Sequence, residues 1–415
     1  MSSPATTERA DPIKCTRPVT DRSVEDVLRQ KATAVLVDSV NSQTLLYHGD
    51  VLHGSYLSLE AIACALKTDD QEVLYHAWVA THKIVNRYQR LKAQHPSIQF
   101  NPVTLALNQF FVEIGANEFD ASPGPHITYI DPRKHCNAEA LVAEAQRRFH
   151  LLKQRNLSEE EILISMPATE EALKATRILC KQGDGRINVN LFLVSSLLHA
   201  AACAEAGAST ITIHVRPILE WFERRQGKRV FSDALEHPGV QSIQSILAYF
   251  KTNKIKTRII GKEFRKASAA IMAEIAVLAD FDAVCVSEYQ LDRLKWNIAR
   301  YDPSIDSYPT VVLRSKQARY PPNILDQDDR FMKNLSPESR GMIRDIMSPA
   351  LERLSEDMDT IEAAIVREVK KQFRATSSPG ASPTKNKEQV ARRHKSQPQS
   401  PERSQKVQPL AGSDP

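Results

Sequence analysis

The sequence lacks long apolar runs, paired-cysteine motifs and glycine-rich phosphate loops. No apolar run approaches the ~20 residues that a transmembrane helix needs, so no membrane association is expected. The six cysteines are scattered, without a C-x-x-C pair or a metal-ligand spacing, which predicts free thiols and no metal site. The polar start, MSSPATTERADPIKCTRPVTDRS, does not resemble a secretory signal. These absences predict a soluble intracellular protein without metal or cofactor.

The sequence also has little charge imbalance outside its last 42 residues. The net charge is +5, and residues 374–415 alone carry eight basic and three acidic side chains. The remaining chain is therefore nearly neutral and offers no overall attraction to a polyanion. No specific nucleic-acid partner is expected.

Composition divides the chain into three parts. Residues 374–415 are rich in Ser, Pro, Gln and Lys and too poor in apolar residues to form a core, which predicts a disordered basic tail. Residues 1–22 are predicted to form a second disordered arm. One folded domain is expected between them, over residues 23–373.

Short apolar runs rich in β-branched residues recur through this central part. Such runs are typical of strands that are buried on both faces of a sheet. They occupy residues 34–40, 126–132, 161–168, 187–194, 209–215, 256–264 and 282–289, with a possible short strand near 50–57.

Helical patterns separate these runs. Residues 137–156 place Leu141, Ala145, Phe149 and Leu152 on one stripe, and Thr169 is a predicted N-cap of the helix that follows it. Strands alternating with helices predict a parallel sheet, and eight strands favour an α/β fold of the closed (β/α)8 TIM-barrel type. An open doubly wound sheet is less favoured because G-x-G-x-x-G and G-x-x-x-x-G-K-S/T are missing.

The last helical pattern, residues 336–373, has apolar residues at a spacing of three to four. These residues are Leu351, Leu354, Met358, Ile361 and Ile365. A stripe of this width predicts a helix that covers the barrel. A helix that binds a partner is the alternative.

Three motifs carry a resemblance to a known family. They are I-N-V-N-L at 187–191, A-x-A-C-A-E-A-G at 200–207 and I-L-E-W at 218–221. With the order of strands, loops and helices around them, the sequence resembles the transaldolase family from about residue 24 to 373. The resemblance implies an (α/β)8 barrel, cytoplasmic sugar-phosphate chemistry of the pentose phosphate type, a sugar phosphate or related small molecule as ligand if the pocket is open, and a possible homodimer.

The resemblance breaks down at the residues that carry the family's reaction. The family's fourth strand reads like I-L-I-K-x-A-S-T, and its lysine condenses with a ketose carbonyl to form an imine. Here the strand reads I-L-I-S-M-P-A-T, which places Ser165 at the lysine position. Serine cannot form an imine. Tyr129 occupies the position of the family's glutamate, and Phe192 occupies that of a threonine.

Other site positions are retained. The resemblance aligns Asp38 with the acid/base aspartate, Asn190 with the active-site asparagine and Arg265 with a phosphate-binding arginine. Arg216 lies one residue before the second phosphate-binding position. Alternation along the seventh strand predicts Glu263 on the same side as Arg265, where Glu263 would pair with Arg265 and repel a phosphate.

Three functional hypotheses follow. The first is a transaldolase-like barrel without ordinary transaldolase activity, which acts as a repurposed or accessory protein. The second is an active transaldolase or aldolase-type transferase that moves a dihydroxyacetone unit with a relocated lysine, such as Lys262. The third, nucleophilic catalysis by Ser165, is weakest because no G-x-S-x-G elbow surrounds it.

Overall fold

The computed structural model describes residues 22–94, 101–122, 124–181, 186–227, 236–265, 274–297, 325 and 331–377. The chain divides into two units, Met1–Val369 and Lys370–Pro415, and the first contains the barrel. The predicted arm (1–22) and tail (374–415) lie outside the described residues, apart from residue 22 and residues 374–377. Their predicted disorder therefore stays a prediction.

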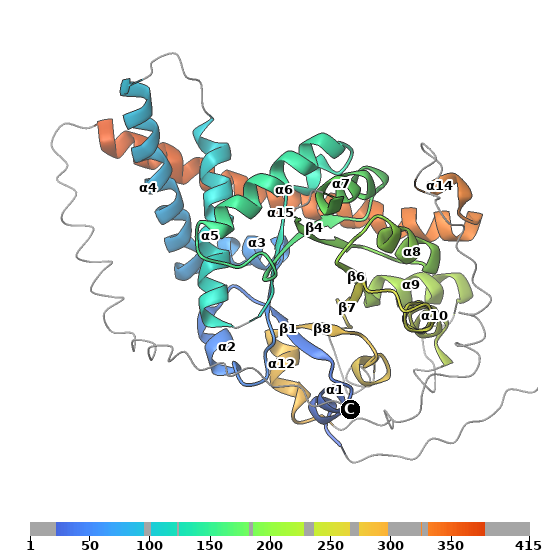
Figure 1. The fold of residues 1–415 in the computed structure, drawn as a ribbon. Coiled ribbons are helices and arrows are strands. Elements are labelled where there is room, and N and C mark those ends of the chain that lie inside the picture. The colour runs from blue at the N-terminus through green and yellow to red at the C-terminus, as the bar shows by residue number, and fades with distance from the viewer. Residues whose placement is uncertain are drawn as a thin grey trace, which may run out of the picture. The chain divides into compact units, whose positions relative to one another are not determined.

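The described strands form a closed parallel barrel in chain order, β1 to β8, with β8 pairing back to β1. This confirms the predicted (β/α)8 TIM barrel, including the short second strand (Figure 1). The strands are β1 (Ala34–Asp38), β2 (Ser55–Leu57), β3 (His126–Tyr129), β4 (Ile162–Pro167), β5 (Asn188–Phe192), β6 (Thr210–His214), β7 (Arg258–Lys262) and β8 (Ala283–Ser287).

Helices connect the strands. Their bounds are α1 (Val24–Gln30), α2 (Ser42–Tyr47), α3 (Leu59–Lys67), α4 (Gln71–Gln94), α5 (Pro102–Ala121), η1 (Pro132–Lys134), α6 (Ala138–Lys153), α7 (Glu170–Lys181), α8 (Leu197–Glu205), α9 (Val215–Gln226), α10 (Pro238–Thr252), α12 (Glu288–Leu294), α14 (Phe331–Asn334) and α15 (Pro337–Ser377).

Local sequence signals explain where these elements begin and which face they bury. The Thr169 hydroxyl accepts a hydrogen bond from the backbone N–H of Ala172 at 3.2 Å, so the predicted cap of α7 is confirmed. The predicted stripe of α6 is buried from Leu141 to Leu152. Strand β4 is buried at all six positions, as expected for a strand covered on both faces.

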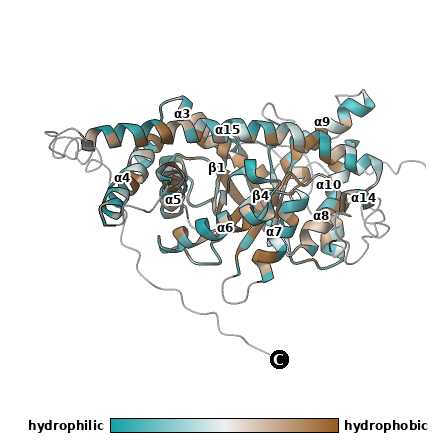
Figure 2. Cartoon of the chain, turned by 90° about the horizontal axis from the view of Figure 1, so that it is seen from above, coloured by the Kyte–Doolittle hydropathy of each residue, from teal (hydrophilic) through white to brown (hydrophobic). Residues whose placement is uncertain are grey.

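Helix α15 packs on the barrel domain, as its apolar stripe predicts (Figure 2). Met358, Ile361 and Ile365 are buried, whereas Leu351 and Leu354 are half-buried. Polar contacts join α15 to three separate elements of the domain. They are Trp221 of α9 with Asp345 (3.2 Å), Arg133 of η1 with Asp359 (2.7 Å) and Lys67 of α3 with Asp357 (3.8 Å).

None of the helices in the described part of the chain combines the length and apolar character that a membrane crossing requires.

Candidate active site at the barrel mouth

Ser165 lies in the middle of the barrel, where the sequence predicts the lost lysine position. Parallel register aligns Ser165 with Asn190, and Asn190 with Thr210 on the next strand. The Asn190 amide donates to the Ser165 hydroxyl at 2.8 Å, and the Thr212 hydroxyl donates to the Asn190 carbonyl oxygen at 2.9 Å. All three residues have 0 % exposure. We call these three residues the core network; its hydrogen bonds satisfy both sides of the Asn190 amide.

Aromatic side chains fill the space around the core network. The ring centroids of Tyr129 and Phe192 are 4.6 Å apart, and the hydroxyls of Tyr129 and Tyr56 are 3.0 Å apart. Tyr129 is 2 % exposed, while Phe192 and Tyr56 are 0 % exposed. Surfaces so inaccessible to water leave no water-sized space beside these groups. Ser165, Tyr129 and Phe192 are therefore part of a packed core.

Asp38 and Lys262 form an ion pair at the carboxyl ends of β1 and β7. The Lys262 Nζ also lies 4.3 Å from the centroid of the Tyr56 ring, a cation–π distance. The second oxygen of Asp38 accepts from the backbone N–H of Ser58 at 3.2 Å. Burial alone would lower the pKa of Lys262, but Asp38, Cys285 and Tyr56 together outweigh burial and raise this pKa above its ordinary value. Lys262 is therefore a paired ammonium at neutral pH.

Glu263 follows β7 and binds two basic groups of the mouth. Its carboxylate lies 3.2 Å from the His214 imidazole and 3.4 Å from the Arg216 guanidinium. Burial opposes ionisation, but His214, Arg216 and Lys262 together lower the pKa of Glu263 to about 2. Glu263 is therefore a carboxylate at neutral pH, and its charge is already compensated by neighbours.

The predicted pairing of Glu263 with Arg265 is wrong. Strand β7 ends at Lys262, and Glu263 has a left-handed φ of 54°, which breaks the alternation on which that prediction rested. Arg265 instead contacts Glu223 of α9 at 2.9 Å and Glu274 at 2.6 Å. Arg265 is thus ion-paired with carboxylates from elsewhere in the chain.

The structure brings the predicted residues together in two groups. Ser165, Asn190, Tyr129 and Phe192 lie in the packed core, whereas Asp38 and Lys262 lie at the mouth. Arg216 and Arg265 lie at the same end of the barrel, each bound to its own carboxylate partners.

The sequence reasoning missed Tyr56, Thr212 and His214. Thr212 pairs with Phe192 and His214 with Lys262 on the neighbouring strands, and the Tyr56 hydroxyl contacts that of Tyr129. Applying two-residue alternation and parallel register to every strand would have found them.

No group of three or more His, Cys, Asp or Glu side chains within the described ranges is arranged to hold a metal ion.

A closed parallel barrel with polar side chains at the carboxyl ends of its strands defines a TIM-barrel protein, whose sites lie at that mouth. Residues 75–300, more than half of the chain, match the Transaldolase/Fructose-6-phosphate aldolase family. The chain belongs to this family.

Curated relatives agree with this assignment. A transaldolase from Methylobacillus flagellatus is 31 % identical over 245 residues, which cover 58 % of this chain and 73 % of the relative. A probable transaldolase from Dictyostelium discoideum is 34 % identical over 46 % of this chain and 57 % of its own length. A transaldolase from Pseudoalteromonas atlantica is 36 % identical over 44 % of this chain and 55 % of its own length.

Among solved structures, the crystal structure of a phosphonopyruvate hydrolase complex with oxalate and Mg++ aligns with 65 % of this chain and 82 % of its own. Its identity is 14 % and its TM-score 0.35, a likeness too low to bear on fold or function.

Proposed function

We propose that this chain is a repurposed or accessory transaldolase-family barrel that does not carry out ordinary transaldolase turnover. One observation carries the proposal: Ser165, which the sequence resemblance aligns with the family's imine-forming lysine, is fully buried and bonded to Asn190. A hydroxyl cannot form the imine that withdraws electrons from the breaking C–C bond. A ketose phosphate also cannot reach a group that water does not reach.

The neighbouring replacements support the same proposal. Tyr129, in place of the family's glutamate, is buried, and desolvation raises its pKa well above the ordinary value of 10.0. It therefore stays a neutral phenol across the physiological range. Phe192, in place of the threonine, has no group to orient water. Restoring one residue would leave the other two functions missing.

The mouth is the place where such a barrel would still meet a small molecule. Its charges come from Asp38, Arg216, Lys262 and Glu263, and they are neutralised mainly by one another. A sugar phosphate would have to displace Glu263 from Arg216 in order to bind there. We therefore expect weak binding of sugar phosphates at the mouth, in a cytoplasmic protein of sugar-phosphate ancestry.

Turnover is the property to test. The chain should be assayed for transfer of a dihydroxyacetone unit from fructose 6-phosphate to an aldose phosphate, with the Methylobacillus flagellatus transaldolase as positive control. The proposal predicts product no faster than in an enzyme-free blank. Transfer at a rate comparable to that of the control would overturn it.

A second candidate function uses Lys262 as the imine-forming amine. The observation in its favour is that Lys262 lies at the mouth beside Asp38, a carboxylate placed to take up its proton. It ranks second because the raised pKa of Lys262 keeps the amine protonated, and an ammonium has no lone pair to attack a carbonyl. Lys262→Arg separates the two candidates: it preserves the charge, so only a reaction through an imine is abolished.

A further inference from the structure

A cavity lies at the opposite end of the barrel from the mouth. It has a volume of about 660 Å³, within the ~300–1,000 Å³ of small-molecule sites, and its lining includes Asn188 and Arg258, the first residues of β5 and β7. Strand alternation places Thr210 and Arg258 on the inward face, two residues before Thr212 and Ile260. The buried core network thus separates this floor cavity from the mouth.

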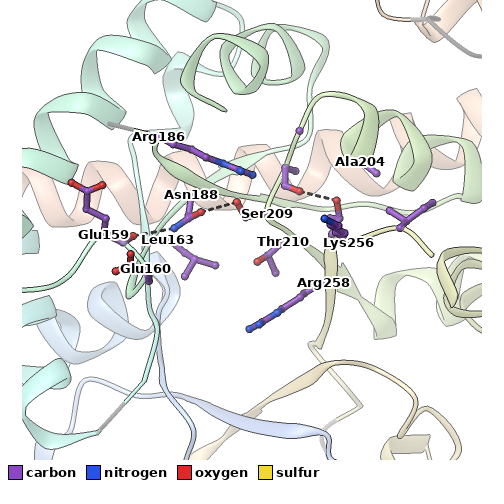
Figure 3. Close-up of a pocket in the computed structure, with 14 residues that line it drawn as sticks. Glu159, Glu160, Leu163, Arg186, Asn188, Ala204, Ser209, Thr210, Lys256 and Arg258 are labelled. Carbon is purple, nitrogen blue, oxygen red and sulfur yellow. Dashed lines mark hydrogen bonds between the residues drawn. The ribbon is translucent and has the colours of Figure 1, made fainter. Parts of the chain in front are cut away.

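Three basic side chains line the floor cavity. Arg186 precedes β5, Lys256 precedes β7 and Arg258 begins β7, so separate parts of the chain bring them together. Figure 3 shows Arg186 and Arg258 on either side of Thr210. All three are exposed, and within the described part of the chain no carboxylate forms an ion pair with any of them.

The acidic residues of the lining do not cancel this excess. Glu159 and Glu160 both line the cavity, but Glu159 is bound to Lys153, which lies outside it. With three basic and two acidic side chains, the lining keeps an excess of one positive charge, which a bound anion would neutralise.

The neutral polar groups of the floor are held in fixed positions. The Ser209 hydroxyl donates to the Asn188 side-chain oxygen at 3.0 Å, and the Asn188 amide donates to the Glu159 backbone carbonyl at 3.0 Å. The Thr257 hydroxyl donates to the Ala208 carbonyl at 2.8 Å. These bonds hold the polar wall of the cavity in place beside its long basic side chains.

We propose that the floor cavity binds a small phosphate-bearing molecule, at a site distinct from the mouth. Two guanidinium groups offer planar pairs of donors that match phosphate oxygens, and the Lys256 ammonium adds a third charge. A cavity of this size holds a compact ligand with one or two phosphate groups. The proposal does not depend on the proposed function, because no residue of the floor belongs to the mouth or to the core network.

Binding of inorganic pyrophosphate to the full chain tests this proposal by isothermal titration calorimetry. Arg186→Gln and Arg258→Gln should each weaken binding by about tenfold, the effect of losing one charge-assisted contact. Two controls should keep binding within about twofold. Arg340→Gln removes an equally exposed arginine on α15, and Arg216→Gln removes an arginine of the mouth.

Hydrogen exchange locates the ligand independently of affinity. Pyrophosphate should slow amide exchange in residues 186–190 and 256–260 and leave the carboxyl ends of the strands unchanged. The proposal is overturned if pyrophosphate does not bind, if Arg340→Gln weakens binding as much as Arg258→Gln, or if only Arg216→Gln weakens it. A short RNA that binds the floor more tightly than pyrophosphate would also overturn it, in favour of a nucleic-acid partner.

Discussion

The two ends of β7 differ in how their charged side chains are stabilised. At the mouth, Lys262 is nine-tenths buried and neutralised by Asp38; at the floor, Arg258 is exposed and has no ion-pair partner among the described residues. A buried charge must be paired, whereas an exposed charge is stabilised by water. The mouth therefore depends on its internal ion pairs, while the floor remains available to an external anion.

The middle of the barrel differs from both ends. It holds neutral polar groups, Ser165, Asn190 and Thr212, whose hydrogen bonds are made with one another. A catalytic amine in the same place would have to be buried and yet accessible to substrate. This buried layer lies between the mouth and the floor of the barrel.

Ser165→Lys should have the largest effect on stability. A lysine side chain is far larger than serine and would enter a fully buried layer, so we expect a loss of at least about 3 kcal/mol in the free energy of unfolding. Ser165→Ala, which removes only the hydroxyl, should cost about 1 kcal/mol. Urea unfolding measures both free energies.

If the Ser165→Lys variant folds, it should show weak or undetectable transaldolase turnover, because Tyr129 and Phe192 remain. Robust turnover would show that the pocket is one substitution from activity.

Lys262→Met should have the next largest effect. It leaves the Asp38 carboxylate without its cation in a largely buried site, which costs about 3 kcal/mol. At the floor, Arg258→Met should change stability by less than about 0.5 kcal/mol, because the arginine is exposed. The double variant Asp38→Asn/Lys262→Met should recover most of the loss. Equal losses of unfolding free energy in Lys262→Met and Arg258→Met would show that the ends of β7 do not differ as described.

Sequence reasoning was successful for the barrel because its signals are local. Apolar runs, the Thr169 cap and the α6 stripe each depend on residues that are near neighbours in the chain. It failed for Glu263, because alternation presumes a continuing strand and the left-handed backbone there ends it. No sequence periodicity predicts such a termination.

The charged partners were harder to predict for a different reason. Asp38 and Lys262 were both identified, but their ion pair joins the first and seventh strands. Arg186 and Arg258 escaped notice because they are brought together only by the pairing of β5, β6 and β7. Long-range partners follow from register and closure, which a single strand does not encode.

Acidification should weaken the mouth selectively. The folded pKa of Glu263 is about 2, below its ordinary 4.5, so its contribution to stability is present above pH 4.5 and is lost as the pH falls toward 2. Urea unfolding at about pH 6 and about pH 3 should show a smaller acid-induced loss in Glu263→Gln than in the unsubstituted chain. Identical losses would contradict this account of the mouth.

Truncation after Ser377 should have the smallest effect. The removed residues carry most of the basic excess but few apolar side chains. The melting temperature of the shortened chain should therefore stay within about 4 °C, the shift that corresponds to ~1 kcal/mol in a small domain. A larger fall in a thermal melt would show that the tail stabilises the folded domain.

The central claim is that the family's imine no longer forms on β4, and borohydride trapping tests it most directly. The chain is incubated with fructose 6-phosphate and borohydride, and its intact mass is compared with that of the Methylobacillus flagellatus transaldolase treated in parallel. The account predicts an adduct on the relative and an unchanged mass for this chain, because Ser165 has no amine and Lys262 is held as an ammonium by Asp38. A stable adduct mapped to Lys262, and abolished by Lys262→Arg, would contradict it and establish a relocated catalytic lysine.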